Sequence, residues 1–153
     1  MTRPFANLTD DQLLALCIFA EARGEPEAGR IAVGSVVLNR VAYGLIHKTW
    51  AMYYGYSIQT VILAPLQFSW VNEGPDPNHL GAVEIAKDFQ EALTVSFEGD
   101  MALWTCCEIA ENLISGSIGK NTAAMYYHDI SVNPPWAKGK TPTLTIGKLI
   151  FYL

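Results

Sequence analysis

The chain has 153 residues, of which 50% are hydrophobic and 16% charged, so it can bury a core and is not a disordered chain. Its 15 acidic residues outnumber its 10 basic ones, and the formal net charge of −5 argues against general attraction to nucleic acid or to an anionic membrane. No apolar run approaches the roughly 18 residues of a membrane span, so no stable membrane insertion is expected. The length predicts a single domain over residues 1–153.

The first half of the sequence predicts three helices, each marked by a capping residue or a helix breaker. They cover residues 9–23, 26–43 and 58–63. Thr9 is a strong N-cap residue followed by two acids, and Gly44 is expected to end the second helix. Because the second helix has little polar face, we expect it to lie centrally.

The second half predicts a change from helices to strands. Two helices are expected over residues 81–97 and 101–115, after a loop rich in proline and glycine over residues 72–79. Aromatic and β-branched residues predict strands over residues 123–128 and 144–153. The sequence therefore predicts an α+β fold, a mostly helical body with a small antiparallel β element at its C-terminal end.

Glu21 is the first candidate for chemistry. Cys17 and Ile18 precede it by four and three residues, so the carboxyl group extends an apolar face of its helix. Burial there would raise the pKa of the carboxyl group and keep it protonated near neutral pH, as a general acid requires. The alternative is a frayed helix end at which Glu21 forms a salt bridge with Arg23 or Arg40.

Aromatic residues in loops and predicted strands form a second candidate group, because their faces stack on sugar rings. They are Phe68, Trp70, Tyr126, Tyr127 and Trp136. An ordinary core role explains Phe68 and one of the tyrosines equally well. It explains Trp136 less well, because this residue lies in a proline-rich loop.

No metal site and no cofactor are expected. The three histidines, His47, His79 and His128, are far apart in sequence, and no HxxxH or CxxC spacing occurs. No GxSxG motif and no glycine-rich phosphate loop after a strand is present. The three cysteines do not make a disulfide framework, so buried, reduced thiols are expected.

Four segments together carry a resemblance to a known family. They are AEARGEPEAGRIAVGSVVLNRV (20–41), QFSW (67–70), AAMYYHDISVNPPWA (123–137) and IGKLIFY (146–152). In this order the chain resembles the cell-wall hydrolase family that is typified by spore cortex-lytic enzymes. The resemblance implies a lysozyme-like helical core and cleavage of peptidoglycan between N-acetylmuramic acid and N-acetylglucosamine, most often as a lytic transglycosylase.

The resemblance also implies roles for individual residues. Glu21 is the first Glu of the EARGE motif, the family's catalytic position. For the reaction that the resemblance implies, we ourselves assign substrate binding to the polar and aromatic residues Gln67, Ser69, Trp70, Tyr127, His128 and Trp136. The sequence departs from the family at Leu149, where a histidine is common, at residues 122–124, which lack the usual glycine, and over residues 72–103, which are longer than usual. These departures bear on fine specificity more than on the reaction.

Two other functions are kept open. A muramidase that uses water would need a second carboxylate, for which Asp76, Asp129 and Glu73 are available in loops. A peptidoglycan-binding module without activity is disfavoured by the presence of Glu21.

The expected partner is the glycan strand of peptidoglycan, bound by a monomer that does not bind nucleic acid. Because no secretory signal is recognised, we expect a phage endolysin that acts on a Gram-negative host. It would be made in the host cytoplasm and reach the periplasmic peptidoglycan after the membrane is permeabilised. A prophage remnant, or a bacterial enzyme whose signal is absent from this sequence, is the alternative.

Overall fold

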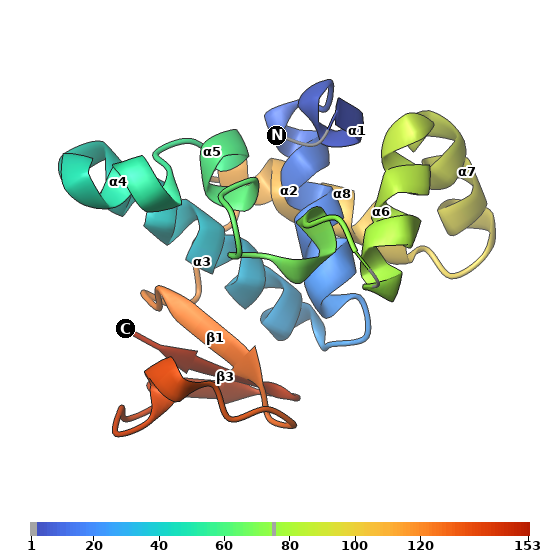
Figure 1. Ribbon diagram of the computed structural model, residues 1–153. Helices are drawn as coiled ribbons and strands as arrows, with labels where there is room; N and C mark the ends of the chain where they lie inside the picture. Colours follow the sequence, from blue (N-terminus) through green and yellow to red (C-terminus); the bar gives the residue numbers. More distant parts are fainter. Residues whose placement is uncertain (1–2, 75) are drawn as a thin grey trace.

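The chain folds as a helical body followed by a small antiparallel sheet, as the sequence predicts (Figure 1). The computed structural model describes residues 3–74 and 76–153. Its helices are α1 (Arg3–Ala6), α2 (Asp10–Ala22), α3 (Glu27–Ile46), α4 (Lys48–Tyr54), α5 (Ile58–Ile62), α6 (Pro77–Lys87), α7 (Phe89–Glu98) and α8 (Ala102–Ser115). No helix in this described part of the chain is long and apolar enough to cross a bilayer.

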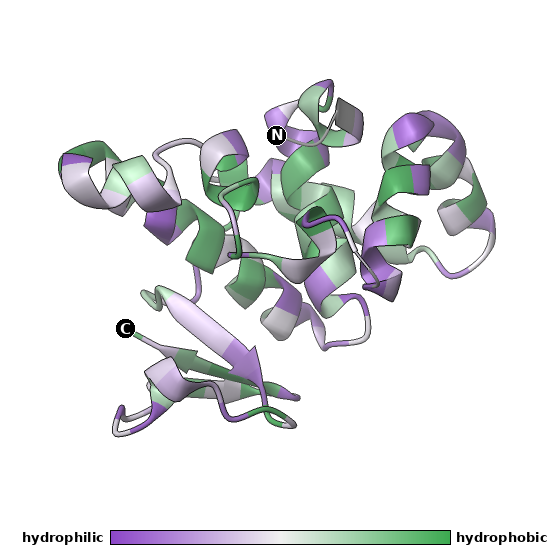
Figure 2. Ribbon diagram, viewed as in Figure 1, coloured by the Kyte–Doolittle hydropathy of each residue, from purple (hydrophilic) through white to green (hydrophobic). Residues whose placement is uncertain are grey.

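Helix α2 is the central element of the body. Thr9 caps it as expected: the Gln12 amide donates to the Thr9 hydroxyl at 3.3 Å, and the Thr9 amide donates to the Gln12 side chain at 3.1 Å. Six successive residues, Leu13 to Ile18, are buried, because α3 and α8 pack against α2. Hydrophobic residues accordingly predominate where these helices meet (Figure 2). This packing fixes the last turn of α2, which carries Glu21.

Helix α3 continues to Ile46, past the end that the sequence predicts at Gly44. A Cβ atom at position 44 would clash with the carbonyl oxygen of Gly55, which lies in the turn after α4. Gly44 is therefore a contact point between two segments and not a helix terminator. Helix α4, which follows α3 after a single residue, is not among the helices predicted from the sequence.

We expect Gly44→Ala to lower the free energy of unfolding by about 1–3 kcal/mol, because the added methyl group forces α3 away from Gly55. Urea unfolding measures this change. Gly81→Ala is the matched control, since Gly81 lies within α6 and a Cβ atom there meets nothing within 4 Å. The control is expected to be neutral or to gain up to ~1 kcal/mol from helix propensity. Equal effects of the two changes would contradict the packing role.

The predicted helix over residues 81–97 is two helices, α6 and α7. The break occurs at Asp88, whose carboxylate accepts a hydrogen bond from the Glu91 amide at 3.2 Å and so caps α7. Helix α6 begins at Pro77, inside the predicted loop, because Asp76 caps it by accepting from the Asn78 amide at 2.9 Å. Helix α8 ends at Ser115, before a left-handed Gly116.

The sheet contains β1 (Tyr126–Asp129), β2 (Leu144–Ile146) and β3 (Leu149–Tyr152) in the order β1-β3-β2. The segment predicted as one strand over residues 144–153 is thus a hairpin, which turns at Gly147 with φ of 54°. The Lys148 amide donates to the Glu25 carboxylate at 3.2 Å and ties this hairpin to the turn between α2 and α3.

Two side chains of α3 form hydrogen bonds with the backbone just before β1. Asn39 donates to the carbonyl oxygens of Thr122 and Ala124, each at 2.9 Å, and the Arg40 Nε donates to the Met125 carbonyl at 2.8 Å. Strand β1 is thereby placed against α3, opposite the last turn of α2.

Candidate active site

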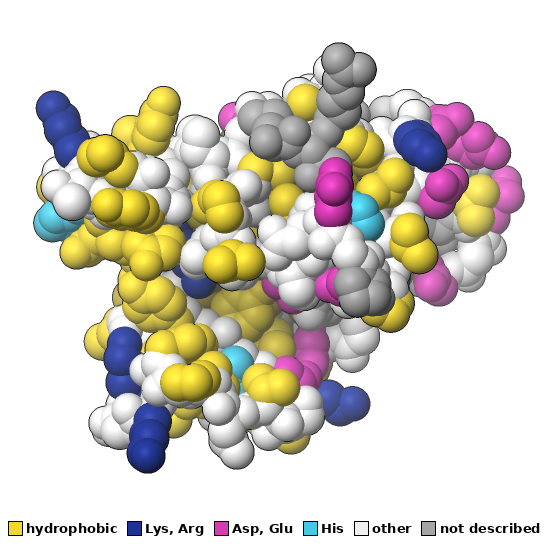
Figure 3. Space-filling model, in the orientation of Figure 1, with side chains coloured by type: hydrophobic (Ala, Val, Ile, Leu, Met, Phe, Trp, Pro, Cys, Tyr) yellow, Lys and Arg dark blue, Asp and Glu magenta, His cyan; other side chains and the backbone are white. Residues whose placement is uncertain are grey.

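Glu21 faces a cleft between the helical body and β1. The cleft has a volume of about 470 Å³, and the space-filling view shows the hollow between the sheet and the helices (Figure 3). Its lining residues come from α2, α3, the segment before and within the 3-10 turn η1 (Ser69–Val71), and β1 with the loop that follows. They are Glu21, Arg40, Leu66, Gln67, Phe68, Ser69, Asn72, Tyr127, His128, Asp129 and Val132.

Burial raises the pKa of the Glu21 carboxyl group to about 7. Tyr127 and Arg40 oppose this rise, and the negative charge of Asp76 adds to it. The direction agrees with the sequence argument from the apolar helical face. A carboxyl group with this pKa is partly protonated at neutral pH and can serve as a general acid and then, once ionised, as a base.

The salt bridge that the sequence allowed for Glu21 does not form. The one ion pair within 4.0 Å among the described residues joins Lys87 to Glu84 on the surface. Arg23 instead lies over the ring of Phe19, 4.9 Å from its centroid. Glu21 therefore meets the cleft without a paired cation.

Arg40 is a functional candidate that the sequence analysis treated only as a possible ion-pair partner. It is buried, and its guanidinium carbon lies 5.5 Å from the centroid of the Phe68 ring. Its Nη1 is buried and has no hydrogen-bond partner among the residues described. Since it lines the same cleft as Glu21, it supplies positive potential that favours the carboxylate form of Glu21. The sequence offered one indication of a buried role for Arg40, which is its position in the apolar stripe of α3, four residues after Val36.

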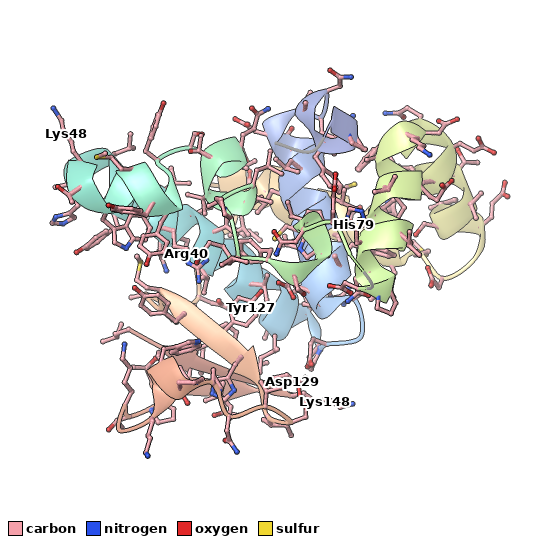
Figure 4. All side chains as sticks on the ribbon, in the orientation of Figure 1. Arg40, Lys48, His79, Tyr127, Asp129 and Lys148 are labelled. Carbon is pink, nitrogen blue, oxygen red and sulfur yellow. The ribbon has the colours of Figure 1, made fainter. Side chains whose placement is uncertain are left out.

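Tyr127 approaches Glu21 from β1, and Figure 4 shows it between the sheet and the helical body, with Arg40 above it. Its hydroxyl is buried and makes no hydrogen bond of ordinary geometry within the described chain, yet it lies near enough to Glu21 to lower the pKa of that carboxyl group. Burial raises the pKa of the Tyr127 phenol, so the hydroxyl stays neutral and can donate.

His128 lines the cleft with both ring nitrogens already engaged. Nδ1 lies 2.8 Å from the carbonyl oxygen of Asp129, and Nε2 lies 2.9 Å from the Tyr152 hydroxyl. Because a carbonyl oxygen only accepts, Nδ1 carries the proton, and Nε2 of the neutral ring accepts from Tyr152. The imidazole is therefore held in one orientation at the cleft.

Gln67 and Ser69 lie in the cleft, as the sequence analysis expected of substrate-binding residues. Ser69 is exposed, and the one side-chain hydrogen bond of Gln67 is a long contact of 3.5 Å to the Pro65 carbonyl oxygen. Both side chains are free to turn toward a ligand.

The prediction that Trp70 contacts the substrate is wrong, because the side chain is buried in the core. It is 1% exposed and lies outside the cleft lining. Its ring meets the Phe5 ring edge-on at 5.3 Å, and its carbonyl oxygen lies 3.1 Å from Nδ1 of His79. The indole Nε1 is buried beside the Cys17 thiol. Trp70 therefore anchors the segment that carries Gln67 and Ser69.

Trp136 also lies elsewhere than expected. It is 41% exposed in the 3-10 turn η2 (Pro135–Ala137) and is not among the residues lining the cleft. Its ring packs at 5.6 Å from Tyr126 and 5.7 Å from His128. Trp136 therefore packs against His128, which lines the cleft, and is not itself among the lining residues.

One further carboxylate lines the cleft, and another affects the pKa of Glu21. Asp129 lines the cleft, and the Ser131 amide donates to its side chain at 2.8 Å, which lowers the pKa of Asp129 and keeps it ionised. Asp76 is held at the start of α6 by its capping hydrogen bond, and its negative charge contributes to the raised pKa of Glu21. Glu73, the third carboxylate that the sequence offered, is exposed.

Neither metal nor thiol chemistry has a visible basis in the part of the chain that the structure describes. It contains no group of three or more His, Cys, Asp or Glu residues that could hold a metal ion. All three cysteines are free; Cys17 and Cys106 are buried, as expected, whereas Cys107 is only half-buried. Burial raises the pKa of the Cys106 thiol to about 11 and that of Cys107 to about 12, so both stay protonated at neutral pH.

The chain belongs to the cell wall hydrolase family, whose profile matches residues 24–152. Because Glu21 precedes the matched residues, its assignment rests on the geometry above and on the EARGE motif. The chain is 29% identical over 150 residues, 96% of its length, to the spore cortex-lytic enzyme of Bacillus subtilis, and spans 38% of that protein. It is 38% identical over 65 residues, 42% of its length, to the spore cortex-lytic enzyme of Oceanobacillus iheyensis, of which it spans 21%.

Two solved structures share the fold. The catalytic domain of the germination-specific lytic transglycosylase SleB from Bacillus anthracis matches with a TM-score of 0.65 at 22% identity, over 97% of this chain and 98% of that one. The catalytic domain of the Bacillus cereus SleB protein matches with a TM-score of 0.54 at 22% identity, over 94% and 89%. The expected lysozyme-like helical body with its small sheet is confirmed.

Proposed function

We propose that this chain is a peptidoglycan lytic transglycosylase that cleaves the bond between N-acetylmuramic acid and N-acetylglucosamine. The observation that carries the proposal is the Glu21 carboxyl group, with a pKa raised to about 7, in a cleft open to a ligand. Membership of the cell wall hydrolase family and the lytic transglycosylase activity of the Bacillus anthracis protein support it.

In the proposed reaction, Glu21 acts twice. Its neutral carboxyl group donates a proton to the glycosidic oxygen while the bond from that oxygen to C1 of muramic acid breaks. The carboxylate then takes the proton of the C6 hydroxyl of the same sugar as the C6 oxygen bonds to C1. The products are a free sugar hydroxyl and a 1,6-anhydro ring, and Glu21 is neutral again. A positioned acid and base of this kind contributes about 10²–10⁴-fold in rate.

The neighbouring side chains suit supporting roles in both steps. Arg40 offers positive potential while Glu21 is ionised, and the Tyr127 hydroxyl can donate to the same carboxylate. We assign Gln67 and Ser69 to the N-acetyl group or to the sugar that carries positive charge in the transition state, because both line the cleft. His128 also lines the cleft, and we assign its ring face to an apolar contact with the sugar, because both of its ring nitrogens are engaged.

A muramidase that uses water is the second candidate, favoured by one observation. Asp129 lines the same cleft and is kept ionised, so it could act as the second carboxylate that hydrolysis needs. A transglycosylase needs no such group, because the acceptor is the C6 hydroxyl of the substrate itself.

Mass spectrometry of the fragments released from purified peptidoglycan tests the proposal. A transglycosylase leaves 1,6-anhydro ends that are lighter by one water and resist borohydride reduction. Reducible ends would assign the muramidase reaction instead. A protein that binds the polymer and releases nothing would be a binding module, the third possibility, and would overturn the proposal.

The pH dependence of cleavage reports on Arg40. Because Glu21 must be protonated to act as an acid, the rate is expected to fall as the pH rises through about 7. Arg40 lowers the pKa of Glu21, so Arg40→Met should move this falling limb to higher pH, and Arg40→Lys should move it less. Initial rates of dye release from labelled peptidoglycan between pH 5 and 9 measure the shift. A limb that stays in place or moves to lower pH would refute this role.

As the biological setting we propose lysis of a Gram-negative host by a phage, with the enzyme made in the cytoplasm and acting in the periplasm. This rests on the sequence expectations alone. Expression in Escherichia coli with and without a pore-forming holin tests it: lysis is expected only when both are present. Lysis without the holin would contradict it.

A further inference from the structure

A row of aromatic rings runs over the end of α3 and along α4. The Tyr43 ring stacks on the His47 ring with centroids 3.9 Å apart, and it lies 5.1 Å from the Trp50 ring, which in turn lies 5.0 Å from the Tyr54 ring. Tyr43 is 40% and Tyr54 36% exposed. Hydrophobic side chains are correspondingly visible over α4 in the space-filling view (Figure 3). None of these rings is among the residues that line the cleft of Glu21.

The aromatic row continues from the cleft along one face of α3. Tyr43 and His47 follow Arg40 by three and seven residues, which places all three on the same face. Tyr43 is thus about 4.5 Å beyond Arg40 along the helix axis. Figure 3 shows hydrophobic side chains between α4 and the sheet, beside the hollow of the cleft. On the side of the sheet, the Tyr126 ring lies 5.6 Å from the Arg40 guanidinium and 5.1 Å from Lys140 Nζ.

Charge is divided between the two sides of the molecule. Nine of the 15 acidic residues lie between positions 73 and 111, whereas none lies between 28 and 72 or between 130 and 153. The aromatic side carries Arg40, Lys48, Lys138 and Lys140 instead. Acidic side chains accordingly gather over α6 and α7 in Figure 3, and Lys48 extends from α4 in Figure 4. This side suits a polymer that bears carboxylates, as the stem peptides of peptidoglycan do.

We propose that Tyr43, Trp50 and Tyr54 form a binding surface for sugar rings of the glycan strand beyond the cleaved bond. This inference rests on the proposed function. Aromatic faces stack on sugar rings, and the tyrosine hydroxyls and the indole N–H offer hydrogen bonds at the ring edges.

The aromatic row is distinct from the aliphatic side of α4. Met52, two residues from both Trp50 and Tyr54, lies on the opposite helical face and lines a separate hollow of about 330 Å³ with Leu45, Lys48 and Tyr56. An aliphatic hollow suits a lipid or a second protein, whereas the aromatic row in line with the cleft suits the polymer that the cleft holds.

Binding to insoluble peptidoglycan tests the inference, in a Glu21→Gln background so that the polymer stays intact. Trp50→Ala with Tyr54→Ala should weaken binding by about tenfold or more. The matched control is Phe97→Ala with Trp104→Ala, which removes another exposed aromatic pair, with centroids 5.3 Å apart, on α7 and α8. The control should bind as the parent does. Thermal melts verify that each variant is folded.

In the enzyme with Glu21 intact, the Trp50 and Tyr54 double variant should cleave long strands more slowly and short fragments at the parent rate.

Failure of the inference is distinguishable from failure of the proposed function. If the parent enzyme releases no fragments, the function is wrong. If it releases fragments and the folded double variant binds and cleaves long strands as the parent does, the aromatic surface is not a glycan site. Sedimentation of the parent with phosphatidylglycerol vesicles, lost in the double variant while glycan binding persists, would assign the surface to a membrane and overturn the inference.

Discussion

Glu21→Gln is expected to lower the rate of peptidoglycan cleavage by about 10²–10⁴-fold or more while the fold is retained. The amide has nearly the shape of the carboxyl group but can neither protonate the glycosidic oxygen nor accept the C6 proton afterwards. The measurement is fragment release from purified peptidoglycan, with binding to the polymer followed in parallel. Binding should persist, because the residues assigned to the sugar are unchanged.

Glu27→Gln is the matched control for this change. Glu27 lies exposed in the first turn of α3, where its charge only complements the helix dipole. We expect its activity to equal that of the unaltered protein. Cleavage by Glu21→Gln at the rate of the control would remove Glu21 from the reaction.

The same substitution should stabilise the protein at alkaline pH. The folded pKa of Glu21, about 7, exceeds the ordinary value of 4.5, so the folded state holds more protons than the unfolded state between these values. The free energy of unfolding therefore falls by on the order of 2–3 kcal/mol as the pH rises from about 4.5 to 7. Gln at this position does not ionise, so the variant does not lose this stability. The melting temperature of Glu21→Gln should exceed that of the parent by about 5–10 °C at pH 8. It should equal that of the parent near pH 4. An equal difference at both pH values would contradict the raised pKa.

Trp70→Ala is expected to give the largest loss of stability, about 3–5 kcal/mol, because it empties a fully buried site. It removes the edge-on contact with Phe5 and loosens the segment that holds Gln67 and Ser69. Activity should therefore fall as well, at temperatures where the variant is still folded. Urea unfolding measures the stability change.

Trp104→Ala is the control, since this tryptophan is 39% exposed on α8. Its truncation should cost roughly 1 kcal/mol or less, as is usual for surface positions. The contrary result is that Trp70→Ala lowers the free energy of unfolding by less than Trp104→Ala does and also weakens glycan binding. That result would support the direct substrate role that the sequence predicts for Trp70.

The features predicted correctly from the sequence depend on neighbours in the chain. Thr9 and Gln12 meet within one helical turn, so the cap of α2 follows from their spacing. Cys17 and Glu21 share a helical face for the same reason, and the raised pKa of Glu21 follows once that face is buried. The change from helices to strands after position 115 follows from composition.

The features missed depend on contacts between distant segments. Gly44 has the local properties of a helix terminator, and only the approach of Gly55 shows that it lies within α3. Trp70 was assigned to the substrate because aromatic faces stack on sugar rings, but its position in the chain does not show whether it faces the cleft or the core. The Phe5 ring against which it packs belongs to the distant helix α1. The role of Arg40 depends on its hydrogen bond to the Met125 carbonyl, which lies 85 residues away and just before β1.

Direct titration of the Glu21 carboxyl group tests the central claim most directly. The protein is labelled with ¹³C at glutamate side-chain carboxyl carbons, and the Glu21 resonance is identified by its loss in Glu21→Gln. The account predicts that this resonance titrates with a midpoint near 7, well above the ordinary value of 4.5. A midpoint near 4.5 would mean that Glu21 is ionised at neutral pH and does not act as the general acid.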